Sequence, residues 1–364
     1  MRIPAQLLET YVAEIFKGAG CPDDESERIA FYLVRANLAG HDSHGVIRVP
    51  RYLSWMEIGS VKAGVQPDVV SEGPTHAVVD GCFGFGQSVG PFCADIGIAK
   101  AEEHGLSIVA IRNSGHLGRI GDWPERAADA GIASLHFVNT SGLGLLVAPY
   151  GSSDRRFSTN PFAAGVPIPG EDPLILDFAT SVVAEGKVLV AHQGGKPLPD
   201  GALISSEGEF STNPELIYGV GTAANPNDMR GGGGAIRAMG EHKGSGLAFL
   251  CEVLAGALTG SGCATPEQSN LANGMLSFYF RPDVLGSEDV FAAEMERYLA
   301  FFRTARPLDG TDRVMIPGEP ENRSRADRLA NGIPLTDTTW ESICSAGDGY
   351  GVRAPALVSE AIAS

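Results

Sequence analysis

The sequence lacks a long hydrophobic run. Of its 364 residues, 43% are hydrophobic, yet they never accumulate into the roughly 18 consecutive apolar residues of a membrane span. Residues 1–16 follow an amphipathic helical pattern, which is not the pattern of a signal peptide. We therefore expect a cytoplasmic globular protein that has no membrane partner.

Regularly spaced cysteines are also missing. No two of the six cysteines form a C-x-x-C pair, and they are scattered over Cys21, Cys82, Cys93, Cys251, Cys263 and Cys344. Structural zinc sites and disulfide frameworks both show characteristic cysteine spacing. We therefore predict neither of them, and expect most of the thiols to be buried as small apolar groups.

Positive charge is scarce. Lys and Arg together number 27 against 44 Asp and Glu, which gives a formal net charge of −17. Nucleic-acid binding depends on clustered cations that neutralise phosphates, so a nucleic-acid partner is not expected. The overall charge does not attract an anionic substrate either. Any anion site must therefore be built locally from a few cations.

A dinucleotide fingerprint of the form G-x-G-x-x-G is not convincingly present. In "GFGQSVG" (84–90) the third glycine falls one place late, and "GVGTAA" (219–224) is followed by "NPND" where a helix should begin. Such partial matches are weak in a chain with 47 glycines. A Rossmann domain is therefore not expected, and a nicotinamide cofactor would be held by a different fold.

The apolar periodicity predicts a mixed α/β protein. Two amphipathic helices open the chain, over 7–16 and from the acidic "CPDDESE" to Gly40. Strands are predicted at 76–80, 106–112, 133–140 and 173–180, alternating with helices at 90–105 and 123–131. Residues 195–240 are predicted as long loops, 243–260 as a buried helix, and 289–305 as an amphipathic helix followed by a polar one.

The densest group of reactive side chains follows the second predicted helix, in "GHDSHGVIRVPRY" (40–52). His44 is a candidate for proton transfer, because a histidine ordinarily titrates near neutral pH. The planar guanidinium of Arg48 matches a carboxylate, while Ser43 and Tyr52 offer neutral hydrogen bonds. The alternative is that these groups cap a helix and cover a surface loop. So many reactive groups between glycines favour a functional site.

Four further segments add candidate residues. "NSGHLGRIGDW" (113–123) places His116 and Arg119 after a predicted strand, and "LDFATS" (176–181) ends another with Asp177. In "GEHKGSG" (240–246), Lys243 stands at a predicted helix start, where phosphate or carboxylate groups bind. "IPGEPE" (316–321) presents Glu319. Ordinary turns and helix caps remain the alternative for each segment.

Two other chemistries were weighed. His41 and His44 stand three apart beside Asp42, but no third metal ligand follows at a telling spacing, so no metal site is predicted. A serine hydrolase uses Gly-x-Ser-x-Gly, and "HDSHG" departs from it at the first glycine. Neither chemistry is favoured.

Taken in order, the motifs resemble those of the malate/L-lactate dehydrogenase-like oxidoreductases, which are not the Rossmann-type lactate and malate dehydrogenases. The resemblance covers nearly the whole chain and also includes "APYGSSDRRFSTNPFAAGVP", "GKPLPDG" and "LAGALTG". "ANLAGHDSHG" is similar to the hydroxycarboxylate dehydrogenase B branch. Gly115 departs from that branch, which has a second histidine at this position, so the breadth of substrates is left open.

The resemblance implies roles for individual residues. His44 and His116 are both candidates for proton transfer, Asp177 may orient the catalytic histidine, and Arg48 binds the substrate carboxylate beside Ser43 and Tyr52. The implied cofactor is NAD or NADP, with NAD preferred, and it is held on a non-Rossmann α/β domain in a homodimer. The residues expected to face it are Thr140, Asp177, Phe178, Ala179, Thr180, Ser181, His242, Lys243, Pro317, Gly318 and Glu319.

These roles imply the interconversion of a 2-hydroxy acid and a 2-oxo acid by hydride transfer, with histidine as the general acid and base. Two alternatives stay open: an imine reductase acting on cyclic 2-carboxylates such as piperideine- or pyrroline-2-carboxylate, and a binding protein whose site has decayed. We predict three segments: an N-terminal helical one (1–72), an α/β cofactor domain (73–240), and a mainly helical C-terminal one (241–364) that packs on the N-terminal helices.

Overall fold

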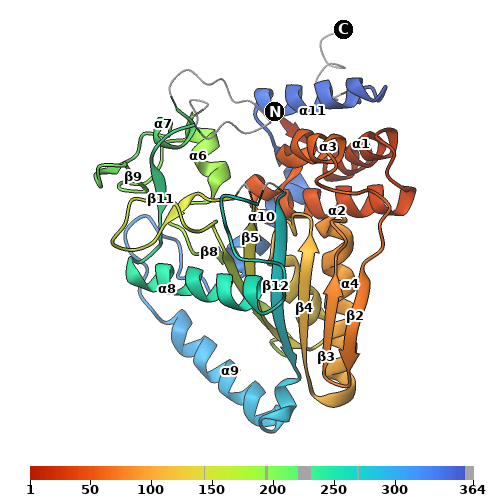
Figure 1. Ribbon diagram of the computed structural model, residues 1–364. Helices are drawn as coiled ribbons and strands as arrows, with labels where there is room; N and C mark the ends of the chain where they lie inside the picture. The colour runs from red at the N-terminus through yellow and green to blue at the C-terminus, as the bar shows by residue number, and fades with distance from the viewer. Residues whose placement is uncertain (143, 193–195, 220–230, 269, 357–364) are drawn as a thin grey trace.

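The protein is built around a mixed seven-stranded sheet. The computed structural model describes residues 1–142, 144–192, 196–219, 231–268 and 270–356 (Figure 1). In spatial order the strands are β2 (Asp68–Gly73), β3 (His76–Asp80), β4 (Leu106–Ser114), β12 (Ala272–Phe280), β5 (Ala133–Ser141), β7 (Pro161–Val166) and β8 (Leu174–Ala179). Within this sheet, only β3 and β4 are paired parallel. A Rossmann sheet is mostly parallel, so the expectation of a non-Rossmann α/β fold is confirmed.

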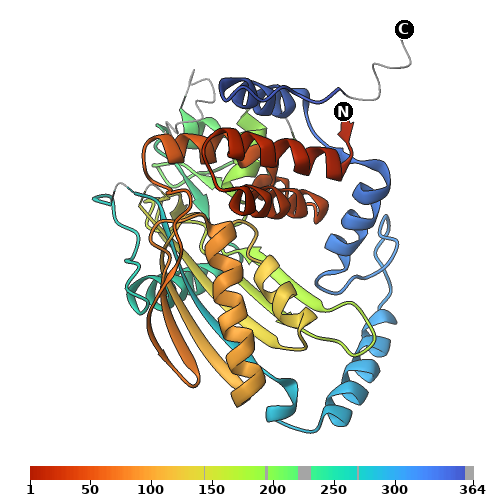
Figure 2. The ribbon, with the colours of Figure 1, turned by 90° about the vertical axis from the view of Figure 1, so that its right-hand side faces the viewer.

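The two faces of this sheet are covered differently. Helices α4 (Gly86–His104) and α5 (Asp122–Asp129) cover one face, where Val109 and Ile111 of β4 are fully buried (Figure 2). On the opposite face, Leu106 and Ile108 of the same strand are 46% and 36% exposed. Both faces of this strand are therefore apolar, and only the face under α4 and α5 is closed.

A helical layer lies at one end of the sheet and joins the two termini. It contains α1 (Ala5–Gly18), α2 (Asp23–Leu38), α3 (Val49–Glu57), α10 (Glu319–Asn331) and α11 (Asp337–Gly349) (Figure 1). Strand β1 (Arg2–Ile3) pairs with β13 (Ile333–Pro334), and Ile3 and Ile333 share one buried core. This confirms the predicted helical part built from both ends of the chain.

Short 3-10 turns η1 (Asp42–His44) and η2 (Val46–Arg48) connect α2 to α3. A smaller, four-stranded sheet lies beside the large one, in the order β10 (Phe210–Ser211), β9 (Leu203–Ile204), β11 (Ala235–Arg237) and β6 (Val147–Ala148). Helices α6 (Glu185–His192) and α7 (Glu215–Tyr218) accompany it. Residues 195–240 were predicted as long loops, but the described part of this region also contains three strands of two or three residues. These strands are too short to leave a periodic signal in the sequence.

The segment beyond residue 240 differs most from its prediction. It supplies β12, which lies between β4 and β5 in the sheet, followed by η4 (Pro282–Val284) and α9 (Glu288–Arg303). The sheet thus crosses both predicted segment boundaries, since β2 begins at Asp68. The predicted helix 243–260 forms as α8 (His242–Cys251) and a π-helical turn, η3 (Glu252–Ala257). It is not fully buried, because Phe249 and Leu250 are 60% and 50% exposed.

None of the helices in the described residues combines the length and apolarity required to cross a membrane.

Gly90→Ala tests the packing of α4 on α5. A Cβ at Gly90 would lie 2.3 Å from Cζ2 of Trp123, which is fully buried. We expect the free energy of unfolding in urea to fall by about 1–3 kcal/mol, as for other overpacked cores. Gly246→Ala in α8 is the control, because nothing lies within 4 Å of the new methyl group. Equal losses in both variants would contradict this packing.

Candidate active site

Two histidines from distant parts of the chain meet face to face. His44 ends η1, directly beyond α2, and His116 follows β4. Their ring centroids are 5.7 Å apart and the ring planes differ by only 7°. The structure thus brings together the two residues that the sequence offered as alternative proton donors.

Glycines allow the His116 loop to reach this position. The N–H of Gly115 donates to the carbonyl of Gly84 at 2.9 Å, and a Cβ at Gly86 would lie 2.1 Å from the carbonyl oxygen of His116. A Cβ at Gly115 would come within 2.6 Å of the Gly84 carbonyl. This loop arrangement therefore leaves no room for a side chain at position 115.

His116 is held by a hydrogen-bonded chain. The hydroxyl of Tyr52, on α3, lies 2.7 Å from Nδ1 of His116, and Nε2 of Gln87 donates to the Tyr52 oxygen at 3.1 Å. Gln87 is the second residue of α4 and is only 1% exposed. The sequence analysis missed it, because a lone glutamine in an apolar helix carries no spacing signal.

The turn that carries His44 is organised from α2. The side chain of Asn37 accepts from the N–H of Val46 at 2.8 Å and donates to Asp42 at 2.6 Å. Within the turn, Oγ of Ser43 lies 3.0 Å from Nδ1 of His44, and Nε of Arg48 donates to the Ser43 carbonyl at 2.6 Å. Through its Nε, Arg48 therefore supports the turn.

A buried carboxylate faces the two arginines of this region. Oε2 of Glu185, at the start of α6, lies 3.8 Å from Arg48 and 3.6 Å from Arg51. Its other oxygen accepts from the hydroxyl of Tyr218 at 2.7 Å. The next residue, Gly186, touches Ser43, since a Cβ there would lie 2.6 Å from that of Ser43. Sequence reasoning missed Glu185, because nothing in the chain signals that α6 reaches this turn.

Burial sets the protonation of the site. It lowers the pKa of His116 to about 3, with further lowering by the positive charges of Arg48 and Arg51. Burial, followed by Arg48 and His116, also holds the pKa of His44 well below its usual value. Burial raises the pKa of Tyr52 to about 12. Near neutral pH both imidazoles are therefore neutral and Tyr52 keeps its proton.

Arg119 takes a structural place. It is 2% exposed, and its Nη1 bonds Asp122 at 3.0 Å and Glu125 at 2.9 Å. Arg35 from α2 and Arg325 from α10 reach the same carboxylates. The charge of Arg119, a candidate residue of the 113–123 segment, thus ties the helical layer to α5.

Asp177 and the residues after it are likewise engaged in the fold. Oδ2 of Asp177 accepts from the N–H of Gly121 at 2.8 Å, which steadies the loop beyond His116 without bonding a histidine ring. The hydroxyl of Thr180 donates to the carbonyls of Thr159 and Asn160, and that of Ser181 to Val183. Phe178 packs on Phe162, and Ala179 ends β8. The hydroxyls of Thr180 and Ser181 thus serve main-chain carbonyls.

Two of the predicted cofactor segments lie side by side. The N–H of Met239 donates to the carbonyl of Thr180 at 2.9 Å, and a Cβ at Gly244 would come within 2.8 Å of the same oxygen. His242 and Lys243 are exposed in the first turn of α8. No ion pair of Lys243 occurs among the described residues. This helix start therefore offers positive charge beside the end of β8.

The remaining predicted cofactor residues, Thr140 and the segment 317–319, contact neighbouring groups of the protein. The hydroxyl of Thr140, in β5, accepts from Asn273 at 2.8 Å. Pro317 and Gly318 contact the start of β8, where the carbonyl of Pro317 accepts from the Ile175 N–H at 3.2 Å. The carboxylate of Glu319 accepts from the N–H of Ile316, with Arg303 and Arg313 3.6 and 3.5 Å away.

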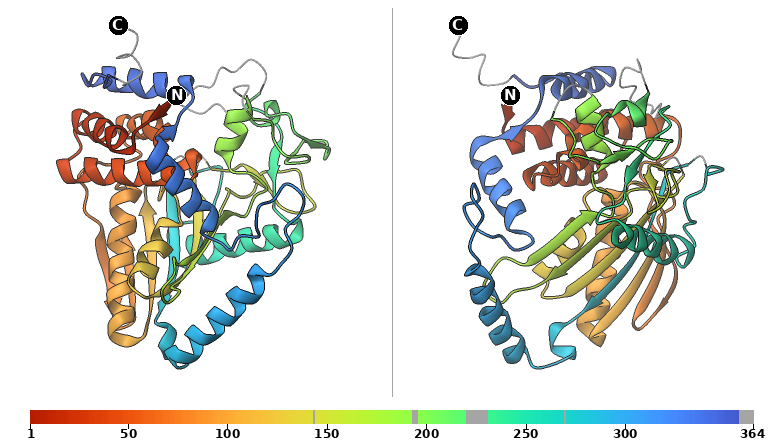
Figure 3. Two further views of the ribbon diagram at one scale, coloured as in Figure 1. Left: turned by 180° about the vertical axis from the view of Figure 1, so that it is seen from behind. Right: turned by 90° about the vertical axis from the view of Figure 1, so that its left-hand side faces the viewer.

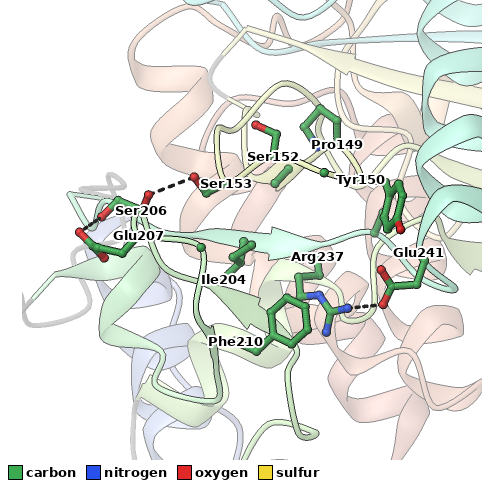
Figure 4. Close-up of a pocket in the computed structure, with 14 residues that line it drawn as sticks. Pro149, Tyr150, Ser152, Ser153, Ile204, Ser206, Glu207, Phe210, Arg237 and Glu241 are labelled. Atoms are coloured by element: carbon green, nitrogen blue, oxygen red, sulfur yellow. Dashed lines mark hydrogen bonds and ion pairs between the residues drawn. The ribbon is translucent and has the colours of Figure 1, made fainter.

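A pocket of about 480 Å³ lies over the small sheet, beside the start of α8 (Figure 4). The guanidinium of Arg237 lies 3.6 Å from the ring centroid of Phe210 and pairs with Glu241. At the edge of the pocket, Tyr150 meets the ring of His242, with centroids 6.0 Å apart. The region of Gly219–Ala224, one of the two incomplete glycine motifs, lies outside the described residues except for Gly219.

In the described ranges, no three His, Cys, Asp or Glu side chains gather as metal ligands. His41, which adjoins the site, pairs instead with Glu321 of α10 at 3.2 Å.

Comparisons with known proteins place this geometry in a family. The sequence profile described as malate/L-lactate dehydrogenase matches residues 3–344. Hydroxycarboxylate dehydrogenase B of Escherichia coli (strain K12) is 37% identical over 359 residues, covering 96% of this chain and 95% of that protein. The chain belongs to the malate/L-lactate dehydrogenase family, as the order of its motifs implied.

Two further matches show the range of the family. A solved structure from Escherichia coli, provisionally assigned as a malate/lactate dehydrogenase, superimposes with a TM-score of 0.89 at 35% identity and covers 100% of this chain and 98% of that one. A reductase of pyrroline- and piperideine-2-carboxylate from Pseudomonas putida is 33% identical over 358 residues, covering 94% of this chain and 96% of that protein. The expected class, an oxidoreductase of the 2-hydroxy acid dehydrogenase type, is confirmed.

His116→Gln tests the buried, neutral state of His116. The folded pKa of about 3 lies below the ordinary value of 6.5, so the unfolded chain binds the proton more tightly. This stabilising contribution is complete above pH 6.5 and is lost as the pH falls toward 3. Between pH 7 and pH 5 we expect the wild type to lose about 2 kcal/mol more unfolding free energy than His116→Gln in urea titrations. Equal losses would show that His116 is solvated.

Proposed function

We propose that this protein interconverts a 2-oxo acid and a 2-hydroxy acid with a nicotinamide cofactor. The observation that carries the proposal is the stacked pair His44 and His116 beside Arg48, in a buried region of an otherwise acidic protein. Such a pair supplies hydrogen-bond donors for a carbonyl oxygen, and the arginine supplies a partner for the adjacent carboxylate.

Arg48 is the proposed carboxylate ligand. Its Nε donates to the Ser43 carbonyl, and we assign the substrate carboxylate to its terminal nitrogens. Glu185 lies beyond hydrogen-bond distance, at 3.8 Å, and moderates the charge of Arg48 and Arg51 without a direct hydrogen bond to Arg48. A small monoanion thus meets a positive but partly compensated site.

The histidines handle the proton. A substrate carbonyl between the imidazoles and Arg48 accepts a hydrogen bond from a ring N–H, which stabilises the negative charge as it develops on the oxygen. The substrate carboxylate offsets the charge of Arg48, so that a ring takes up a second proton together with the substrate, passes one proton to the oxygen and returns to its neutral form. Ser43 holds one nitrogen of His44, and Tyr52 holds one nitrogen of His116. In each ring Nε2 is therefore the nitrogen that faces substrate. Burial excludes water, which strengthens these contacts.

The segments around β8 suit a nicotinamide cofactor by their chemistry. Lys243 and the positive end of α8 fit a pyrophosphate, and the acceptor oxygens of Glu319 fit ribose hydroxyls. Ile175, beside Gly318, and Thr180, beside Gly244, are about 16 Å apart along an extended strand, which suits an elongated ligand. When bound, the cofactor supplies the hydride. NAD remains the preferred form.

The experiment that tests this function follows absorbance of the reduced nicotinamide. Wild type and Arg48→Ala are offered NADH or NADPH with 2-oxo acids and, side by side, with cyclic imines. We expect turnover of 2-oxo acids by the wild type. Arg48→Ala should lose about 2–5 kcal/mol of transition-state stabilisation in kcat/KM, because a charge-assisted contact is removed. Arg28→Ala, on the exposed side of α2, is the matched control.

Three other results of this assay would contradict parts of the proposal. Turnover of imines alone would favour the second candidate, which rests on the similarity to the pyrroline- and piperideine-2-carboxylate reductase. Unchanged activity in Arg48→Ala would contradict the carboxylate assignment. Flat cofactor titrations would favour a binding protein with a decayed site.

We further propose that the protein is a homodimer joined through an apolar face, defined here as Leu106, Ile108, Phe249, Leu250 and Val253. Helix α8 and the π-turn η3 lie across one part of the sheet, on the side away from α4 (Figure 3). The five side chains of the apolar face are 36–60% exposed. Exposed apolar side chains gathered on one side of a protein are typical of an interface.

Phe249→Glu tests the apolar face. We expect a shift from dimer to monomer in sedimentation equilibrium, because a buried unpaired carboxylate costs several kcal/mol at an interface. Phe31→Glu, at an exposed phenylalanine of α2 outside the apolar face, is the control and should leave the mass unchanged. A dimer that persists in Phe249→Glu, or a monomeric wild type, would contradict the assignment.

A further inference from the structure

Gln87, Tyr52 and His116 are linked by hydrogen bonds, and the donor and acceptor in each bond can be assigned. Nε2 of Gln87 lies 3.1 Å from the Tyr52 oxygen and 3.5 Å from the carbonyl oxygen of His116. A carbonyl oxygen accepts only, so the amide must present its NH₂ group to this corner. The reverse orientation would bring two oxygens together. Gln87 therefore donates to Tyr52.

The direction continues to the histidine. Because the Tyr52 oxygen accepts from Gln87, its own proton is available for the remaining neighbour, Nδ1 of His116 at 2.7 Å. If Nδ1 carried the ring proton, that proton and the Tyr52 hydroxyl proton would both lie between the two atoms and repel each other. If the hydroxyl turned away to avoid this, its proton would be buried without an acceptor. Nδ1 must therefore be the bare nitrogen of the neutral ring.

We infer that Gln87 is a positioning residue that acts through Tyr52 to keep the neutral His116 ring protonated on Nε2. This extends the proposed function, since Nε2–H is the group that a substrate carbonyl meets. The opposite tautomer would point a lone pair at the carbonyl oxygen and repel it. Gln87 does not touch the substrate in this arrangement.

The surrounding backbone holds Gln87 at this corner. Gln87 stands in the first turn of the 19-residue helix α4, next to Gly86, which packs on the His116 carbonyl. The backbone of Gly118 lies close to the Gln87 amide, because a Cβ at Gly118 would be 3.0 Å from Nε2 of Gln87. The Oε1 atom of Gln87 is buried without a hydrogen-bond partner among the described residues. The unpaired Oε1 costs free energy of folding, and the NH₂ group of Gln87 is nevertheless held beside Tyr52.

The first test is the tautomer itself. Protein labelled with ¹⁵N in histidine is examined by NMR at pH 7, where the two neutral tautomers give distinct ring-nitrogen signals. The His116 signals are assigned by their loss in His116→Gln. We expect a protonated Nε2 and a bare, hydrogen-bonded Nδ1 in the wild type. A protonated Nδ1 or a doubly protonated ring would overturn the inference without any activity measurement.

The second test asks whether Gln87 acts through Tyr52. We expect Gln87→Met to lower kcat roughly 10- to 100-fold, below or at the lower end of what a positioned proton donor contributes, with KM within about twofold. In a Tyr52→Phe background the same substitution should cost nothing further, as expected for residues that act in series. Equal costs in both backgrounds would show a merely structural role.

A neighbouring residue supplies the control. Ser88 follows Gln87 on α4, and its hydroxyl donates to Glu25 at 3.1 Å, away from the histidines. Ser88→Ala should change neither the His116 tautomer nor kcat, and the signals of His136, which bonds Ser277 and Ser134, should stay fixed in every variant. A correct tautomer without turnover of any 2-oxo acid would count against the proposed function and leave the inference standing.

Discussion

The hydrogen bond between Tyr52 and His116 is the contact on which the rest of the site depends. Tyr52 belongs to the helical layer and His116 to the end of the sheet, 64 residues away. Their 2.7 Å contact can form only because Gly84, Gly86 and Gly115 let two loops touch backbone to backbone. Once it forms, His44 on the neighbouring turn stacks on His116, and two separate layers share one buried site.

The same junction is held from outside by charge. Arg119 is buried against Asp122 and Glu125, and arginines from α2 and α10 complete the cluster. Breaking such a network costs more than its assembly contributes, because each lost partner leaves a buried charge. The network therefore specifies how the helical layer sits on α5. In a protein of net charge −17, the remaining arginines near the histidines, Arg48 and Arg51, supply the local positive potential for an anion.

The sequence predicted several residues of the site, but not the tertiary contacts that hold them in place. His44, Arg48 and His116 stand in motifs whose residue types suggest chemistry, and resemblance to a family brought them together. Gln87 and Glu185 were missed because their roles depend on tertiary contacts with Tyr52 and Arg48. Periodicity found β3, β4, β5 and β8 but missed β12, since no local signal tells that residues 272–280 enter the sheet between β4 and β5. Thr180 and Ser181 stand in a suggestive motif, yet their hydroxyls serve main-chain carbonyls.

The central claim is that a 2-oxo acid lies between Arg48 and the stacked histidines. The most direct measurement is a crystal structure of the protein with oxamate, an amide analogue of a 2-oxo acid that cannot accept a hydride productively. The account predicts the carboxylate of oxamate on Arg48 and its amide carbonyl oxygen within hydrogen-bond distance of a ring Nε2 of His44 or His116. Oxamate bound elsewhere, for instance over Arg237 in the pocket of the small sheet, with Arg48 bare, would contradict it.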